Sequence, residues 1–157
     1  MADQVTDEAT RTKAPWHLWL IAIVGVLWFA GGAWDYVQTQ FRNEDYLGEM
    51  AESVGTDLQV ILDYYGSFPA WVDAMWALSV WAALASALLL LARSRFAYHA
   101  MILSIIGLVG STIYTYTTDM PEALNSPFAV VFSIVIWVSV ILFAFYARRM
   151  TAAGVLR

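Results

Sequence analysis

Four long apolar runs, separated by polar connections, dominate the pattern of hydrophobic and polar positions along the chain. The runs cover residues 16–37, 70–92, 96–114 and 128–146. Each is close to the roughly 20 residues that a helix needs to cross the hydrocarbon core of a bilayer. Because lipid-exposed backbone has to satisfy its hydrogen bonds within its own segment, the pattern predicts an all-α, polytopic membrane protein. We expect a single membrane domain over residues 1–157, a four-transmembrane-helix bundle with a polar tail at residues 1–14.

The connection of residues 38–69 carries a different pattern. In it Leu58, Ile61, Leu62 and Tyr65 follow the i, i+3, i+4, i+7 spacing of an amphipathic helix. This spacing predicts an external helix between the first and second spans. We expect it to cap the outer end of the bundle; the alternative is that it lies flat on the lipid headgroups.

The basic residues are sorted by side. Seven of the eight lie before the first run, between the second and third, or after the fourth: Arg11, Lys13, Arg93, Arg95, Arg148, Arg149 and Arg157. Only Arg42 lies elsewhere, in the connection between the first and second runs. Cytoplasmic loops hold an excess of Lys and Arg close to the helix ends. The sorting therefore predicts a multi-pass protein of a cell inner membrane, with both termini cytoplasmic and residues 38–69 outside.

Composition supports the membrane class and excludes others. The chain is 61% hydrophobic and 13% charged, whereas soluble domains are about 45–50% apolar and about 25% charged. A net charge of −5 argues against a nucleic-acid partner, which requires a basic surface. The chain has no cysteine and no Gly-rich phosphate loop, HExxH or G-x-S-x-G motif, so we expect neither a thiolate metal site nor an enzyme.

Two aspartates within the apolar runs are the first candidates for a site, because ionisable residues in a membrane segment are costly. Asp35 lies near the outer end of the first run, and Asp73 lies in the first turn of the second. Arg42 follows Asp35 by two helical turns, and Tyr114 ends the third run in the same layer. We expect a polar outer-face site for a cation, a proton or a polar solute. The structural alternative is that Asp73 stabilises a helix N-terminus while Asp35 snorkels or pairs with Arg42.

Other candidates have ordinary interpretations. Trp28 and Trp137 lie deeper than the aromatic belts, where they would line a cavity for a quinone or pigment, although packing and lipid contact is the interpretation we favour. His17 and His99 both fall at the cytoplasmic interface with no carboxylate near them in sequence. We therefore expect no metal there and assign no cofactor.

A string of residues resembles a known family. It consists of Trp16-His17-Leu18-Trp19, Leu27-Trp28, Gly32, Asp35-Tyr36, Thr39-Gln40, Arg42-Asn43-x-x-Tyr46-Leu47, Phe68-Pro69-x-Trp71-Val72, Trp76-Ala77, Val80-Trp81 and Tyr146-Ala147-Arg148-Arg149-Met150. It resembles a family of small four-helix bacterial inner-membrane proteins of unknown function, some of which are labelled sugar transporters. The chain departs from the family pattern at Phe41 and at Phe29-Ala30. The resemblance implies location and topology, and it adds Tyr36, Thr39, Gln40 and Asn43 to Asp35, Arg42, Asp73 and Tyr114 as candidate site residues.

Three functions from different classes follow from these patterns. The leading hypothesis is a non-catalytic membrane protein that works by association, with itself or with other membrane subunits, as an accessory or scaffold subunit. The second is a transporter or binding protein for a small solute or cation that uses Asp35, Arg42 and Asp73. The third is a membrane subunit that binds a quinone or pigment.

Overall fold

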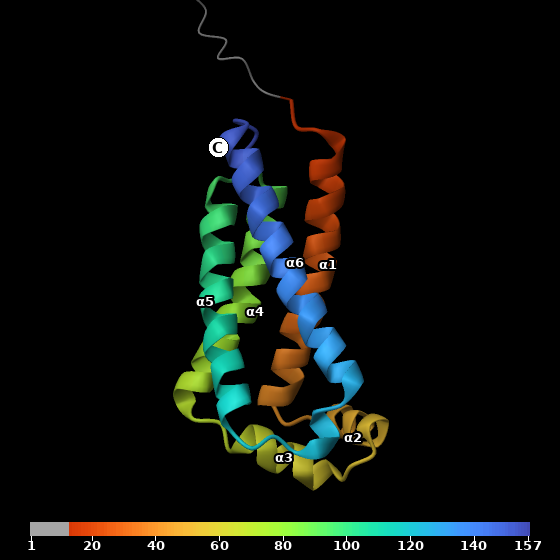
Figure 1. Ribbon diagram of the computed structural model, residues 1–157. Helices are drawn as coiled ribbons and strands as arrows, with labels where there is room; N and C mark the ends of the chain where they lie inside the picture. The colour runs from red at the N-terminus through yellow and green to blue at the C-terminus, as the bar shows by residue number, and fades with distance from the viewer. Residues whose placement is uncertain (1–12) are drawn as a thin grey trace, which may run out of the picture.

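The computed structural model describes residues 13–157, and every regular element in this range is a helix (Figure 1). Residues 1–12 of the predicted polar tail lie outside the described residues. The elements, in chain order, are α1 (Trp16–Gln40), α2 (Glu44–Val54), α3 (Leu58–Gly66), α4 (Ala70–Leu91), α5 (Phe96–Thr117), the short 3₁₀ helix η1 (Glu122–Leu124) and α6 (Pro127–Ala152). The predicted all-α class is confirmed for the described residues.

Four of these helices are long and apolar enough to cross a membrane: α1, α4, α5 and α6. They correspond to the four apolar runs of the sequence, but three of them extend beyond those runs. The largest extension is in α6, which continues through Arg148 and Arg149 to Ala152. A helix does not end where its apolar run ends, because arginine is itself a good helix former.

The long helices form a bundle whose closest pair is α4 and α5. In this pair Gly107 of α5 lies against the backbone of α4. A Cβ added to Gly107 would lie 2.5 Å from the carbonyl oxygen of Met75 and 2.6 Å from the amide nitrogen of Ser79. The antiparallel arrangement follows from the short connection of residues 92–95 between the two helices.

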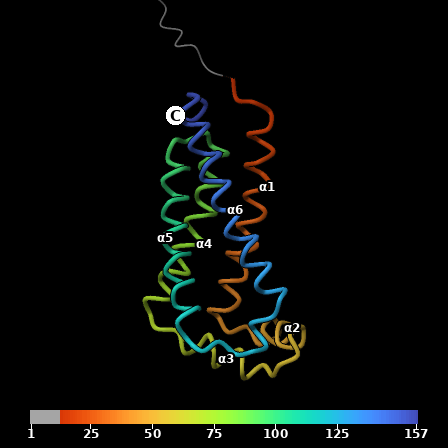
Figure 2. Tube along the Cα trace, viewed as in Figure 1, coloured from red at the N-terminus to blue at the C-terminus, as the bar shows by residue number. Residues whose placement is uncertain are grey.

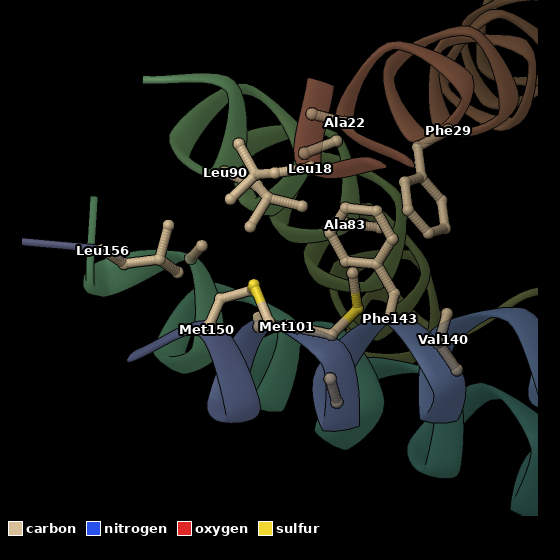
Figure 3. Packing of buried hydrophobic residues seen from close by; sticks show 14 of the residues in the cluster. Leu18, Ala22, Phe29, Ala83, Leu90, Met101, Val140, Phe143, Met150 and Leu156 are labelled. Carbon is tan, nitrogen blue, oxygen red and sulfur yellow. The ribbon is translucent and has the colours of Figure 1, made fainter. Parts of the chain in front are cut away.

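The main hydrophobic core lies where α1, α4, α5 and α6 meet (Figure 3). Phe29 of α1 and Phe143 of α6 pack edge to face, with ring centroids 5.3 Å apart. Leu18, Leu90 and Met101 contribute fully buried side chains from α1, α4 and α5. All four long helices therefore share one core.

The two short helices α2 and α3 lie together at one end of the bundle, and the α4–α5 connection and the end of α6 lie at the other (Figures 1 and 2). We call α2 and α3 the cap. Leu47 and Ala51 of α2 are buried against Ile61 of α3, and Leu124 from η1 packs on this cluster. The sequence interpretation was incomplete here, because it predicted one helix in this connection and the structure has two.

Candidate functional site

The site is built around the end of α1. Phe41 ends the helix, and Arg42 then adopts a left-handed conformation with φ of +50°. The amide of Arg42 donates to the carbonyl oxygen of Thr39, and the amide of Asn43 donates to the carbonyl oxygen of Gln38, each at 3.0 Å. These two bonds define a Schellman motif, whose left-handed position is usually a glycine. The chain therefore turns sharply at Arg42 into the cap.

The turn is followed at once by the start of α2. Asn43 is the N-cap of that helix, and its side-chain oxygen accepts a hydrogen bond from the amide of Tyr46 at 3.3 Å. The hydroxyl of Tyr46 in turn donates to Oδ1 of Asp35 at 2.7 Å. A hydrogen bond to a carboxylate is stronger than one between neutral groups. It joins the first turn of the cap to the last turns of α1.

This contact corrects the predicted role of Arg42. Residues 35 and 42 were expected on one face of a continuous helix, with Arg42 as the counter-ion of Asp35. The helix ends before Arg42 and the chain reverses, so the partner of Asp35 is Tyr46. Within residues 13–157, the guanidinium of Arg42 forms no ion pair or hydrogen bond.

Arg42 lies instead in a pocket of about 190 Å³ between the cap and the ends of α1 and α4. Eight residues line it: Thr39, Gln40, Arg42, Leu47, Leu62, Tyr65, Gly66 and Asp73. The side-chain amide of Gln40 donates to Oδ1 of Asp73 at 3.2 Å, which connects α1 to α4 across one side of the pocket. The guanidinium lies over Gly66, because a Cβ added to that glycine would be 2.9 Å from Nη2.

A cluster of aromatic rings fixes the cap on α4. Trp76 of α4 stacks on Tyr65 of the cap at 5.6 Å and meets Tyr36 of α1 edge to face at 5.1 Å. Phe68 contacts Trp76 at 6.3 Å and Tyr114 of α5 at 5.3 Å. Aromatic pairs of these geometries stabilise by about 0.5–1.5 kcal/mol each beyond their buried area. Tyr36 and Tyr114 therefore belong to the packing between helices and do not line the pocket.

The structure brings only part of the predicted site together. Four of the predicted residues line the pocket, namely Thr39, Gln40, Arg42 and Asp73. Asp35 and Asn43 serve the junction with Tyr46, and Tyr36 and Tyr114 serve the aromatic cluster. The sequence analysis did not assign Tyr46, Tyr65 or Gly66 to the site, although the Asn43-x-x-Tyr46 spacing is that of an N-cap and its N3 residue.

Two cap tyrosines have perturbed acidity. Burial, the hydrogen bond to Asp35 and the charge of Asp35 raise the pKa of Tyr46 to about 12. Burial is also the main cause that raises the pKa of Tyr65, and the charge of Asp35 adds to it. Both hydroxyls therefore remain protonated around neutral pH, and the Tyr46 hydroxyl is a hydrogen-bond donor there.

The other sequence candidates lie away from this pocket. Nδ1 of His17 and the Tyr146 hydroxyl are 2.6 Å apart, at the bundle end opposite the cap. Trp28 donates to Ser139 of α6 at 3.2 Å and so joins α1 to α6. Among the described residues, no group of three or more His, Cys, Asp or Glu side chains is placed to hold a metal ion.

Fold and site together define a class: a small all-helical protein with four helices able to cross a membrane and a helical cap at one bundle end. No family model, curated protein or solved structure matches the chain. The resemblance drawn from the sequence therefore stays a prediction, and function has to be argued from the geometry.

Proposed function

We propose that this is a multi-pass protein of a bacterial inner membrane that works by association, with a second copy or with other membrane subunits. The observation that carries the proposal is the outer face of α6. In the most apolar stretch of α6, only 17% of the residues are buried within the chain, whereas the corresponding share is 28% in α1 and in α4. Phe128, Phe132 and Phe145 are among its exposed large side chains. Phenylalanine is among the residues that are enriched at contacts between proteins.

The polar groups of the candidate site support association in preference to catalysis. Asp35 is engaged by Tyr46, and Asp73 by Gln40. Asn43 is engaged as a helix cap. The contacts of Asp35 and Asn43 hold the cap on the bundle, and the contact of Asp73 joins α1 to α4. These are structural roles that need no substrate. A rigid bundle with an ordered cap presents fixed surfaces to a partner.

The charges support an orientation with the cap on the non-cytoplasmic side of the membrane. Arg93, Arg95 and Arg149 lie at the bundle end opposite the cap. The cap carries six acidic residues in its helices and flanking turns: Glu44, Asp45, Glu49, Glu52, Asp57 and Asp63. Basic residues near helix ends mark the cytoplasmic side. The proposal therefore places the chain end after α6 and residues 92–95 in the cytoplasm.

A pair of matched double substitutions tests the association. Ile141→Ala with Phe145→Ala removes two exposed side chains one turn apart on α6. The control, Ile106→Ala with Ile113→Ala, removes two similarly exposed side chains from one face of α5. We expect the α6 pair to weaken assembly at least tenfold, because truncation of two large side chains removes the close packing that drives helix association in a membrane.

The measurement is the mass of the particle in polymer nanodiscs cut directly from the membrane. After the lipid and polymer are subtracted, the wild type and the α5 variant are expected to have the same protein mass per particle, a multiple of the 17.5 kDa of one chain. A wild type found only as single chains contradicts the proposal. Equal loss of assembly in both variants shows that α6 is not the interface.

A further inference from the structure

The pocket between the cap and the ends of α1 and α4 contains one positive and one negative side chain that do not pair with each other. Arg42 and Asp73 both line it. No contact of 4 Å or less joins them in the described part of the chain, and Gln40 is the residue that hydrogen-bonds Asp73. Opposite charges that face one space without meeting leave room between them for a group that satisfies both.

Two features place the guanidinium beside this pocket, although Arg42 is an exposed residue. Arg42 occupies a left-handed position at φ of +50°, where glycine is the usual residue. Its side chain then passes over Gly66, whose missing Cβ leaves space for Nη2. The five N–H donors of an arginine fit the two oxygens of a carboxylate in a fixed geometry.

The opposite side of the pocket suits an ammonium group. Asp73 accepts one hydrogen bond from Gln40 through Oδ1. A carboxylate has two oxygens and about four acceptor positions, so Oδ2 remains able to accept from a ligand. The hydroxyl of Thr39 donates to the carbonyl of Asp35, which leaves its oxygen as a further acceptor.

Size limits the ligand further. The pocket has a volume of about 190 Å³. Drug-sized ligands occupy pockets of roughly 300–1,000 Å³, so this one is small. We propose that the pocket binds a small amino-acid zwitterion, with the ligand carboxylate on Arg42 and its ammonium group on Asp73.

Calorimetric titration of the full chain in lipid nanodiscs tests this proposal, with L-alanine as the probe. Propionate carries only the carboxylate, and isopropylamine carries only the ammonium group. We expect saturable binding of one L-alanine per chain and at least tenfold weaker binding of each single-charge analogue. No saturable binding of L-alanine, or propionate binding as tightly as L-alanine, would overturn the proposal.

Four variants locate the site. Arg42→Gln and Asp73→Asn each remove one charge and are expected to weaken L-alanine binding at least tenfold. Gly66→Ala keeps both charges but pushes the guanidinium aside, so it tests the site even where a charge substitution fails to fold. Arg95→Gln, at the other end of the bundle, is expected to bind as the wild type does. Unchanged binding in Arg42→Gln, Asp73→Asn and Gly66→Ala would overturn the assignment, and this outcome is independent of the association proposed above.

Discussion

Single hydrogen bonds decide how the cap meets the bundle. The Tyr46 hydroxyl reaches the carboxylate of Asp35 across the turn at Arg42, which places a neutral donor against a partly buried charge. Leaving such an acceptor without its donor costs more than the bond itself contributes, because the carboxylate then keeps its desolvation penalty. Tyr46 therefore has a larger effect on stability than its exposure suggests.

Tyr46→Phe is expected to lower the free energy of unfolding by about 1–3 kcal/mol, since it removes this donor from a charged acceptor. Denaturant unfolding in detergent, followed by circular dichroism, measures the change. Tyr116→Phe is the control, because Tyr116 is 76% exposed and its hydroxyl forms no hydrogen bond within residues 13–157. Equal effects of the two substitutions would show that the Asp35 contact contributes nothing.

The raised pKa of Tyr46 predicts a sensitivity to alkaline pH. Its value of about 12 in the fold lies above the ordinary value of about 10. The fold therefore favours the protonated hydroxyl, and this stabilisation is complete below pH 10 and is lost as the pH rises through 12. In Tyr46→Phe, this contribution to the decline between pH 10 and pH 12 should be absent.

Ultraviolet absorbance of the phenolate after a rapid pH jump measures the shift. The difference between the wild type and Tyr46→Phe isolates the titration of Tyr46. We expect a midpoint near 12 in the wild type and a lower one in an Asp35→Asn background, because that change removes the neighbouring charge. A wild-type midpoint near 10 would mean that Tyr46 is neither buried nor next to a charged Asp35.

The sequence pattern grouped four of the eight residues that line the pocket but did not predict their partners. Thr39, Gln40, Arg42 and Asp73 were predicted together, and they line one pocket. The pairing of Asp35 with Arg42 was wrong, because it assumed that α1 continues through residue 42. No local sequence pattern predicts that an arginine occupies the left-handed position after a helix, where glycine is usual.

At the scale of helices, the close approach of α5 to the backbone of α4 depends on a glycine. Gly107 lets α5 approach the backbone of α4 near Met75 and Ser79. Small residues have this role between membrane helices. Lipid tails are as apolar as the side chains, so no hydrophobic effect drives the helices together and close packing supplies the attraction. Gly31 of α1, by contrast, has open space where a Cβ would be.

Gly107→Ala and Gly31→Ala are therefore expected to change stability in opposite directions. The added methyl of Gly107→Ala meets backbone atoms that cannot move aside, and overpacking of this kind costs about 1–3 kcal/mol. Gly31→Ala is expected to stabilise by about 0.5–1 kcal/mol, because alanine loses less backbone freedom in a helix. Steric-trap or denaturant unfolding in bicelles measures both, and a stabilised Gly107→Ala would contradict the packing described.

The sequence predicted the long helices well and the cap incompletely. An apolar run long enough to span a bilayer is a strong signal, and all four runs correspond to helices. The α2 helix was missed because its buried positions, Leu47 and Ala51, are few and Gly48 lies between them. Its stability comes from Asn43 at its start and from packing on α3. The packing is a tertiary interaction, which the local sequence pattern does not show.

At the scale of the whole molecule, one proposal connects the fold to the function: the cap lies on the non-cytoplasmic side of the membrane and residues 92–95 lie in the cytoplasm. The sorting of basic side chains supports this orientation, which sets the partners that each surface can meet. The pocket beneath the cap would then face external solutes, and the arginines at the far end would face the cytoplasm.

Labelling of single cysteines tests this orientation most directly, because the chain has no cysteine of its own and the wild type is a blank. Ser53→Cys introduces an exposed thiol on α2, and Ala92→Cys introduces one just after α4. With a membrane-impermeant maleimide on intact cells, we expect Ser53→Cys to be labelled and Ala92→Cys to be labelled only after permeabilisation. The reverse pattern, or labelling of both in intact cells, would contradict the proposed orientation.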